Sequence, residues 1–303
     1  MNYLSEQADG QLEIINKREK IDTILKNEKV SEEIKEKLRL VLDVRGVIEK
    51  ELSLKVYDNY STYVDLKRAW VIKVLSVSEK CEIKPFEWSF PVVGSVPYLG
   101  FFKEQSAIRK EKEFKAKGYD TIISDVPAFS TLGWFSDPVL SSFISYNDFY
   151  IISTIIHETV HVNIFQKGDM TFNENIASFI EEEGTKLYLE KKYGKDSSKY
   201  IEYQSYIAKE ALKINYLKKV IYELEVFYSR GVDCTKIKKQ RKEKFRAYEK
   251  EFMEQFGYKV KINNAFLVYI KLYNIQKDHF QKELKEKFDD NLKLFIESYK
   301  GAK

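Results

Sequence analysis

The feature that most constrains the fold of this chain is an apolar run, residues 150–165, that carries two of its three histidines. Because this run is apolar on almost every side, it predicts a helix buried in a core. His157 and His161 are four residues apart, so their imidazoles lie on one helical face and can reach a single metal ion. Together with Glu158 they form the pattern H-E-x-x-H, which is typical of zinc hydrolases. A metal ion would also give a partner to polar groups that cost roughly 2 to 7 kcal/mol each when buried alone.

A third protein ligand is expected, because a hydrolytic zinc site usually takes three and leaves a fourth position for water. Residues 172–180 read as the start of a second helix, with Asn173 as its N-cap. A turn at Gly168-Asp169 lets the two helices pack side by side. Glu174, in the first turn of the second helix, is the predicted third ligand. The alternatives are Glu181, Glu182 and Glu183, although a run of three carboxylates is more often a solvated helix flank.

Further short motifs follow one another in order along nearly the whole chain. They lie at residues 10–12, 90–94, 96–102, 118–120, 126–135, 137–140, 167–169 and 263–265. With H-E-x-x-H followed by N-E-x-x-A, the chain resembles the gluzincin metallopeptidases, and in particular a bacterial family of predicted zinc-dependent aminopeptidases. The resemblance implies one zinc ion held by His157, His161 and Glu174, with Glu158 as the catalytic base, which agrees with the spacing argument.

The chain departs from that family in three places. Ser89 and Ser95 stand where the family tends to have cysteines, so no disulfide is expected there. Phe129 replaces a usual tyrosine and removes a hydroxyl that could touch substrate. Relatives are often lipoproteins with a lipidated N-terminal cysteine, whereas this chain opens Met1-Asn2-Tyr3-Leu4. The resemblance therefore implies a periplasmic or membrane-tethered protein if an upstream signal was removed, and a cytoplasmic one otherwise.

Composition predicts a protein with a substantial core. With 303 residues, 44% of them hydrophobic, we expect one metallopeptidase domain over residues 1–303. Within it we expect an N-terminal helical layer (1–80), a small sheet with the zinc-binding helices (81–195) and C-terminal helices (196–303). No apolar run is long enough to span a bilayer, so no transmembrane segment is predicted.

Charge and cysteine content argue against two other kinds of site. The net charge is only +4, and the densest basic stretch, residues 236–246, reads as a solvated helix face. A nucleic-acid site would need exposed stacking aromatics and a recognised fold as well, so no nucleic-acid partner is predicted. Cys81 and Cys234 are too few and too isolated for a disulfide framework or a cysteine metal site, and they leave the redox compartment undecided.

Periodicity predicts a mostly helical α+β fold, zincin-like, with a small sheet beside the active-site helix. Strands are expected around 92–98 and 121–126 with a helix over 104–117 between them, and residues 128–135 are the candidate substrate wall by analogy with gluzincins. Further helices are expected over residues 11–25, 31–52 (with Ser31 as N-cap), 62–75, 198–229, 236–256 and 263–299.

The predicted function is a zinc-dependent peptidase, with an aminopeptidase favoured by the resemblance and a peptide as substrate. Glu158 would take a proton from the metal-activated water and deliver it to the leaving amine. Tyr273 is the predicted oxyanion donor, and His279, which reads as an exposed helix position, ranks below it. The residues that could capture a free α-amine are Glu182, Glu183, Asp137 and Asp169.

Several other readings stay open at this point. An endopeptidase has the same metal site, and a structural or binding protein could keep the metal without turnover. A helical di-iron protein needs a second Glu-x-x-His, which the sequence lacks. His157 and His161 could also be ordinary core histidines, a reading that the long family match disfavours. The sequence makes no prediction about oligomeric state.

Overall fold

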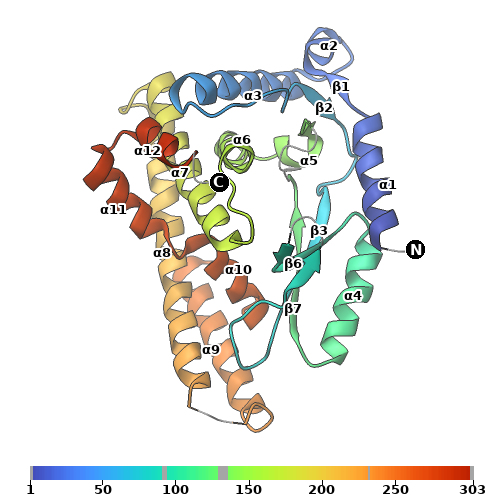
Figure 1. Cartoon of the computed structure of the whole chain (residues 1–303), viewed down its shortest axis with the longest axis vertical. Coiled ribbons are helices and arrows are strands. Elements are labelled where there is room, and N and C mark those ends of the chain that lie inside the picture. The colour runs from blue at the N-terminus through green and yellow to red at the C-terminus, as the bar shows by residue number, and fades with distance from the viewer. Residues whose placement is uncertain (1–2, 91–93, 129–135, 231–232, 301–303) are drawn as a thin grey trace. The chain divides into compact units, whose positions relative to one another are not determined.

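The computed structural model describes residues 3–90, 94–128, 136–230 and 233–300 (Figure 1). The chain divides into two compact units. Unit 1 comprises Met1–Lys73, Asp125–Gln204 and Ile275–Lys303, and unit 2 comprises Val74–Ser124 and Ser205–Asn274. Both units are mostly helical with small sheets, in agreement with the predicted α+β class. The prediction of one domain over residues 1–303 stays a prediction.

Unit 1 is built around two adjacent helices, α6 (Asp148–Asn163) and α7 (Met170–Tyr193), which pack on each other and on α3 (Glu32–Glu51) (Figure 1). A Cβ atom added at Gly184 of α7 would lie 3.1 Å from Leu52 Cδ1 and 3.3 Å from Ile156, so the helices approach closely at this glycine. A larger residue there would require these side chains to shift by a few tenths of an ångström. The other unit 1 helices are α1 (Tyr3–Asn16), α2 (Ile21–Lys26), α5 (Ser141–Ile144), α11 (Lys277–Phe288) and α12 (Leu292–Tyr299).

A small sheet precedes α6 in unit 1. It has the order β1 (Glu19–Lys20), β2 (Thr62–Val64) and β8 (Val139–Leu140), with β1 antiparallel and β8 parallel to β2. In register, Tyr63 lies opposite both Glu19 and Val139. Because β8 runs directly through α5 into α6, this sheet anchors the start of the central helix.

Three of the predicted helices need correction. The helix predicted over 62–75 is wrong, because its β-branched residues pair as β2 and as the start of β3 (Ile72–Ser78). The helix predicted over 11–25 is broken where residues 19–20 pair with β2, a tertiary contact that overrides helical periodicity. The helix predicted over 263–299 is three helices, and Asp289 and Asp290 between the last two adopt left-handed φ of 49° and 58°. By contrast, Ser31 caps α3 as predicted, accepting a hydrogen bond from Ile34 N.

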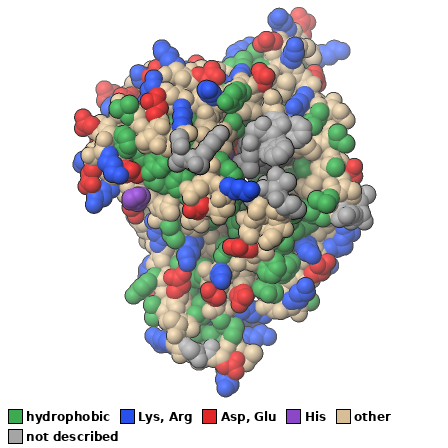
Figure 2. Space-filling model, in the orientation of Figure 1, with side chains coloured by type: hydrophobic (Ala, Val, Ile, Leu, Met, Phe, Trp, Pro, Cys, Tyr) green, Lys and Arg blue, Asp and Glu red, His purple; other side chains and the backbone are tan. Residues whose placement is uncertain are grey.

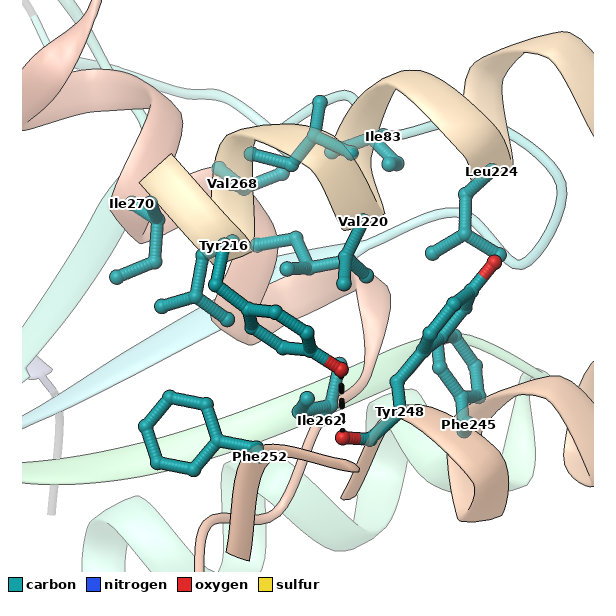
Figure 3. Packing of buried hydrophobic residues seen from close by; sticks show 13 residues of the cluster. Ile83, Tyr216, Val220, Leu224, Phe245, Tyr248, Phe252, Ile262, Val268 and Ile270 are labelled. Carbon is teal, nitrogen blue, oxygen red and sulfur yellow. Dashed lines mark hydrogen bonds between the residues drawn. The ribbon is translucent and has the colours of Figure 1, made fainter. Parts of the chain in front are cut away.

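The core of unit 2 is formed by helices α8 (Ser198–Tyr228, in this unit from Ser205), α9 (Lys238–Phe256) and α10 (Asn264–Asn274). Figure 3 shows the aromatic rings of Tyr216, Tyr248 and Phe252 packed among aliphatic side chains. The Tyr216 hydroxyl donates to the Tyr248 carbonyl at 2.9 Å, so its polar end is satisfied within the core. These aromatic residues therefore contribute to packing in the core of unit 2.

The predicted strand–helix–strand region lies largely in unit 2. Its three-stranded sheet has the order β6 (Tyr98–Phe101), β3 and β7 (Asp120–Val126), with α4 (Glu104–Ala116) between β6 and β7 in sequence. The strand prediction over 121–126 and the helix prediction over 104–117 are confirmed. The central strand β3 was missed, because its first residues belong to the segment predicted as helix.

A separate hairpin joins β4 (Trp88–Phe90) to β5 (Gly94–Val96). Ser89 lies directly opposite Ser95, and their hydroxyl oxygens are 3.2 Å apart. A hydrogen bond between the two serine hydroxyls therefore joins the two strands at this point.

A disulfide that the sequence analysis did not predict joins Cys81 to Cys234 within unit 2. Cys81 follows β3, and Cys234 precedes α9, 153 residues later. Two isolated cysteines carry no pairing signal in a sequence, so only the fold could reveal this bond.

The surface fits the charge pattern of the sequence. Figure 2 shows acidic and basic side chains interspersed on the face that it draws. In the basic stretch 236–246, Arg241 pairs with Asp120 and the Lys244 ammonium lies 5.1 Å from the Phe227 ring. Among the described helices, none has both the length and the apolar composition needed to cross a bilayer.

Candidate metal centre

Three ligand atoms from α6 and α7 converge at one point in unit 1. His157 Nε2 and His161 Nε2 are 3.1 Å apart, and Glu174 Oε2 lies 3.3 Å from the first and 3.5 Å from the second. Together, His157, His161 and Glu174 form a group that could hold a metal ion. The structure thus brings together the three residues predicted as ligands.

The two helices begin at capped positions that set their register. Asn147 caps α6, accepting from Tyr150 N at 2.9 Å, and Asp169 caps α7, accepting from Phe172 N at 2.8 Å. Gly168, with φ of +84°, turns the chain between the helices as predicted. His157 and His161 lie on the face of α6 that meets Glu174 in the early part of α7.

The prediction that Asn173 caps the second helix is wrong. Asn173 lies inside α7, only 1% exposed, and its side chain binds the main chain of Gln166 through both its amide oxygen (2.7 Å) and its amide nitrogen (2.8 Å). Asp169, four residues earlier, takes the cap instead. Asn173 therefore ties the connection between α6 and α7 to the helix that carries Glu174.

Glu181, predicted as an alternative ligand, has a different position. Its Oε2 lies 2.8 Å from His157 Nδ1, on the opposite side of the imidazole from the convergence point. A carboxylate there fixes the ring orientation and directs Nε2 toward the shared point. The neighbouring carboxylates point to lysines: Glu183 pairs with Lys186, and Glu182 pairs with Lys186 and Lys277.

The centre favours positive charge. Burial alone would lower the pKa of His157, but its contacts with Glu174 and Glu181 outweigh burial and raise that pKa well above its ordinary value. Burial would raise the pKa of Glu174, yet the two histidines hold it below its usual range. Glu174 Oε2 and His161 Nδ1 are buried, and no residue in the described part of the chain forms a hydrogen bond with either atom. A buried carboxylate oxygen without a donor is the state that a bound cation would relieve.

Glu158 lies beside these ligands but is not one of the converging groups. The residue is half-buried. Burial raises the pKa of Glu158; the two histidines oppose that rise, and the negative charges of Glu174 and Asp137 add to it. The carboxylate is therefore shifted toward holding a proton, as a group that takes one up during a reaction requires.

The other predicted site residues have these places. Asp169 is the α7 cap, and Asp137 is buried, with its backbone N–H donating to Asn59 Oδ1 at 2.7 Å. His279 is exposed on α11, consistent with its low rank. Tyr273 belongs to α10 of unit 2, where its ring stacks on Tyr269 with centroids 4.7 Å apart, and its role stays a prediction. Of the predicted substrate wall, residues 129–135 lie outside the described residues, as does the substitution at Phe129.

Comparison with known proteins places the chain in a family. The chain belongs to the family described as Putative aminopeptidase, whose model matches residues 2–302. Membership of this family supports a peptidase function in general. No match was found among curated proteins or among solved structures.

Proposed function

We propose that this protein is a zinc-dependent aminopeptidase of the gluzincin type, with a zincin-like active-site fold. His157, His161 and Glu174 would hold one zinc ion, and Glu158 would act as general base. The observation that carries the proposal is that His157, His161 and Glu174 bring their ligand atoms together, while no described residue forms a hydrogen bond with the buried Glu174 Oε2.

The spacing of the ligand atoms suits zinc. With Zn–N and Zn–O bonds of about 2.0 to 2.2 Å, neighbouring ligands of a tetrahedral site lie roughly 3.3 to 3.6 Å apart. The three separations in this centre, 3.1, 3.3 and 3.5 Å, are close to that range before any ion is added. Two neutral imidazoles and one carboxylate are also a known ligand set of catalytic zinc.

The side chains have distinct tasks in the proposed hydrolysis. A bound zinc ion would polarise the scissile carbonyl and make a water molecule acidic near neutral pH. Glu158 receives the proton of the attacking water and passes it to the leaving amine. Glu181 holds His157 in the orientation that binding requires.

The exopeptidase preference rests on family membership. An aminopeptidase must recognise a free α-amine, whereas an endopeptidase with the same centre need not. The proposal therefore predicts faster hydrolysis of unblocked substrates.

The experiment combines metal analysis with two substrates on one preparation. We expect about one zinc ion per chain, hydrolysis of short aminoacyl substrates, and little cleavage of an N-blocked, internally quenched peptide. Preferential cleavage of the blocked peptide would identify an endopeptidase. Bound zinc without either activity would favour the structural or binding role.

Removing the carboxylate behind His157 should weaken the metal site without removing a ligand. For Glu181→Ala we expect zinc affinity to fall about 10- to 100-fold, because the imidazole loses the partner that fixes its orientation. Competition with a chelating dye measures this change.

Glu183→Ala is the matched control for Glu181→Ala. It removes a carboxylate from the same helix, but Glu183 faces Lys186, and Lys186 retains Glu182 as a partner. Zinc affinity should be unchanged in this variant. Equal losses in both variants would show that α7 as a whole, rather than the contact to His157, sets the affinity.

We also propose that the protein works in an oxidising compartment, as the periplasmic or tethered location implied by the resemblance would be. The disulfide between Cys81 and Cys234 supports this, since disulfides persist mainly outside the reducing cytosol. Rapid alkylation of thiols in intact cells, followed by mass spectrometry of the two cysteines, tests it. Fully alkylated cysteines would contradict the proposal.

A further inference from the structure

A buried pair of hydroxyl groups joins α6 and α7 beside the candidate metal centre. Ser153 Oγ of α6 lies 3.2 Å from Thr185 Oγ1 of α7. Ser153 is 9% exposed and Thr185 is fully buried, and the buried Tyr203 of α8 also forms hydrogen bonds with this pair. Apolar residues of the same shape can replace two such partners at almost no loss of stability. Packing alone therefore does not account for a polar pair at this position.

The direction of the hydrogen bonds follows from the number of protons. Thr185 Oγ1 donates its only proton to the Glu181 carbonyl at 2.7 Å, so toward Ser153 it acts as an acceptor, with Ser153 as the donor. These bonds form a chain from Ser153 on α6 through Thr185 to the backbone of Glu181 on α7. The side chain of that same Glu181 lies 2.8 Å from His157 Nδ1. The hydroxyl pair is thus bonded to the residue that orients a predicted metal ligand.

The hydroxyl contact and the contact between His157 and Glu181 are neighbours along the two helices. Ser153 and His157 are four residues apart on α6, and Glu181 and Thr185 are four residues apart on α7. Each spacing is about one helical turn, so each pair of residues lies on one face of its helix. The earlier residue on α6 meets the later residue on α7, as expected for antiparallel helices. A shift at one contact must therefore move the other.

The hydroxyl pair can hold the register of the two helices in a way that apolar contacts cannot. Next to Thr185, α7 meets α6 through the apolar contact of Gly184 with Ile156. Apolar attraction has no preferred direction, so a small slide or rotation of one helix costs little. A hydrogen bond depends on both distance and angle, and a slide of one helix would break it. The polar pair therefore resists a motion that the apolar contact permits.

We propose that Ser153 and Thr185 are positioning residues of the metal centre, which fix α6 and α7 in the register where Glu181 meets His157. Neither residue touches the metal or the substrate in this role. Their effect reaches the centre through Glu181, whose carboxylate directs His157 Nε2 toward the other two ligands. The inference rests on the zinc site of the proposed function and extends it to residues outside the ligand set.

The test is Thr185→Val, which removes the hydroxyl and keeps the branched shape of the side chain. We expect zinc affinity, measured by competition with a chelating dye, to fall about 10-fold, as for the loss of a residue that supports a metal ligand. Thr185→Ser keeps the hydroxyl and should retain the affinity of the parent. A role in stability alone would lower the melting temperature and leave the zinc affinity of the folded protein unchanged.

A double-mutant cycle tests whether Thr185 acts through Glu181. In the Glu181→Ala protein the carboxylate behind His157 is already absent, so Thr185→Val should cause little further loss of zinc affinity. Strictly additive losses in the double variant would overturn the proposal, because they would show that Thr185 affects the centre by another route.

Thr159→Val is the matched control. Thr159 is also a buried threonine, but its hydroxyl donates to the Ile155 carbonyl of its own helix at 2.6 Å. Its loss of a hydroxyl should leave zinc affinity unchanged. An equal fall in Thr159→Val and Thr185→Val would overturn the proposal, since it would show that any buried hydroxyl of these helices affects the centre.

Further results separate this inference from the proposed function. A parent protein that binds no zinc overturns both. A parent that binds zinc but hydrolyses no peptide overturns the peptidase alone, because the inference is measured by affinity. Unchanged zinc affinity in Thr185→Val overturns the inference alone. If Thr185→Val does not fold, Ser153→Ala breaks the same contact from α6, and its zinc affinity decides in the same way.

Discussion

Glu158→Gln is expected to lower kcat about 10²- to 10⁴-fold while leaving zinc content and KM nearly unchanged. The amide has almost the shape of the carboxylate but cannot accept a proton from water. Glu158 is not among the three converging ligands, so the metal centre should persist. Steady-state hydrolysis of an aminoacyl substrate, together with elemental analysis of the same sample, measures both quantities.

His161→Ala supplies the contrast to this variant. It removes a ligand rather than the base, so zinc content and hydrolysis should be lost together. Glu183→Gln repeats the carboxylate-to-amide change on α7 away from the centre and should retain both. If Glu158→Gln cleaves peptides as fast as the parent, the assignment of Glu158 as base is wrong.

The candidate metal centre was the part most open to prediction from sequence. Residues on one helix have a fixed spacing, so His157 and His161 had to share a face of α6. Assigning Glu174 required an assumption about how two helices pack, but the short connection after α6 left few carboxylates within reach. Glu181, seven residues beyond Glu174, lies on the same face of α7 by the same periodicity. Which of the two meets the convergence point depends on how α6 and α7 pack, and they approach closely at Gly184.

The parts that sequence did not predict depend on contacts between distant segments. The break in the first predicted helix arises from pairing with residues 62–63. This pairing has no local signal in the helical segment itself, because the partner strand lies more than 40 residues later in the chain. The same holds for the disulfide of unit 2, whose cysteines are 153 residues apart.

The motif Asn263-Asn264-Ala265 illustrates how a family motif can serve structure. Asn264 is fully buried, and its amide nitrogen donates to the carbonyls of Glu79, Lys80 and Glu82 at 2.8, 3.1 and 3.2 Å. Its Oδ1 accepts from the Tyr228 hydroxyl at 3.0 Å. The motif thus holds the turn after β3 against α10, which accounts for it without a catalytic role.

Cys81 lies in this same turn, and removing its disulfide with Cys234 should strongly destabilise unit 2. For the double variant Cys81→Ser/Cys234→Ser we expect a loss of about 2 to 5 kcal/mol in the free energy of unfolding, with the upper end set by the length of the closed loop. Urea unfolding measures the loss in the free energy of unfolding. Hydrogen exchange shows which helices are destabilised, because the amides of α9 and α10 should lose protection while those of α6 and α7 keep theirs.

Reductant provides the control for the disulfide prediction. It should destabilise the parent and leave the double variant unaffected, because only the parent has a bond to reduce. Equal stability of the parent and the double variant would contradict the prediction.

Asn264→Ala should cost less in the double variant than in the parent, because the turn at residues 79–82 is held twice. In the parent, the disulfide keeps the turn in place, so the three carbonyls stay buried without a donor after Asn264 is replaced. The free energy of unfolding should then fall by about 1 to 3 kcal/mol. Without the disulfide, the turn can move away from α10 and its carbonyls can bind water instead. A double-mutant cycle measures this coupling, and strictly additive losses would show that the two contacts hold the turn independently.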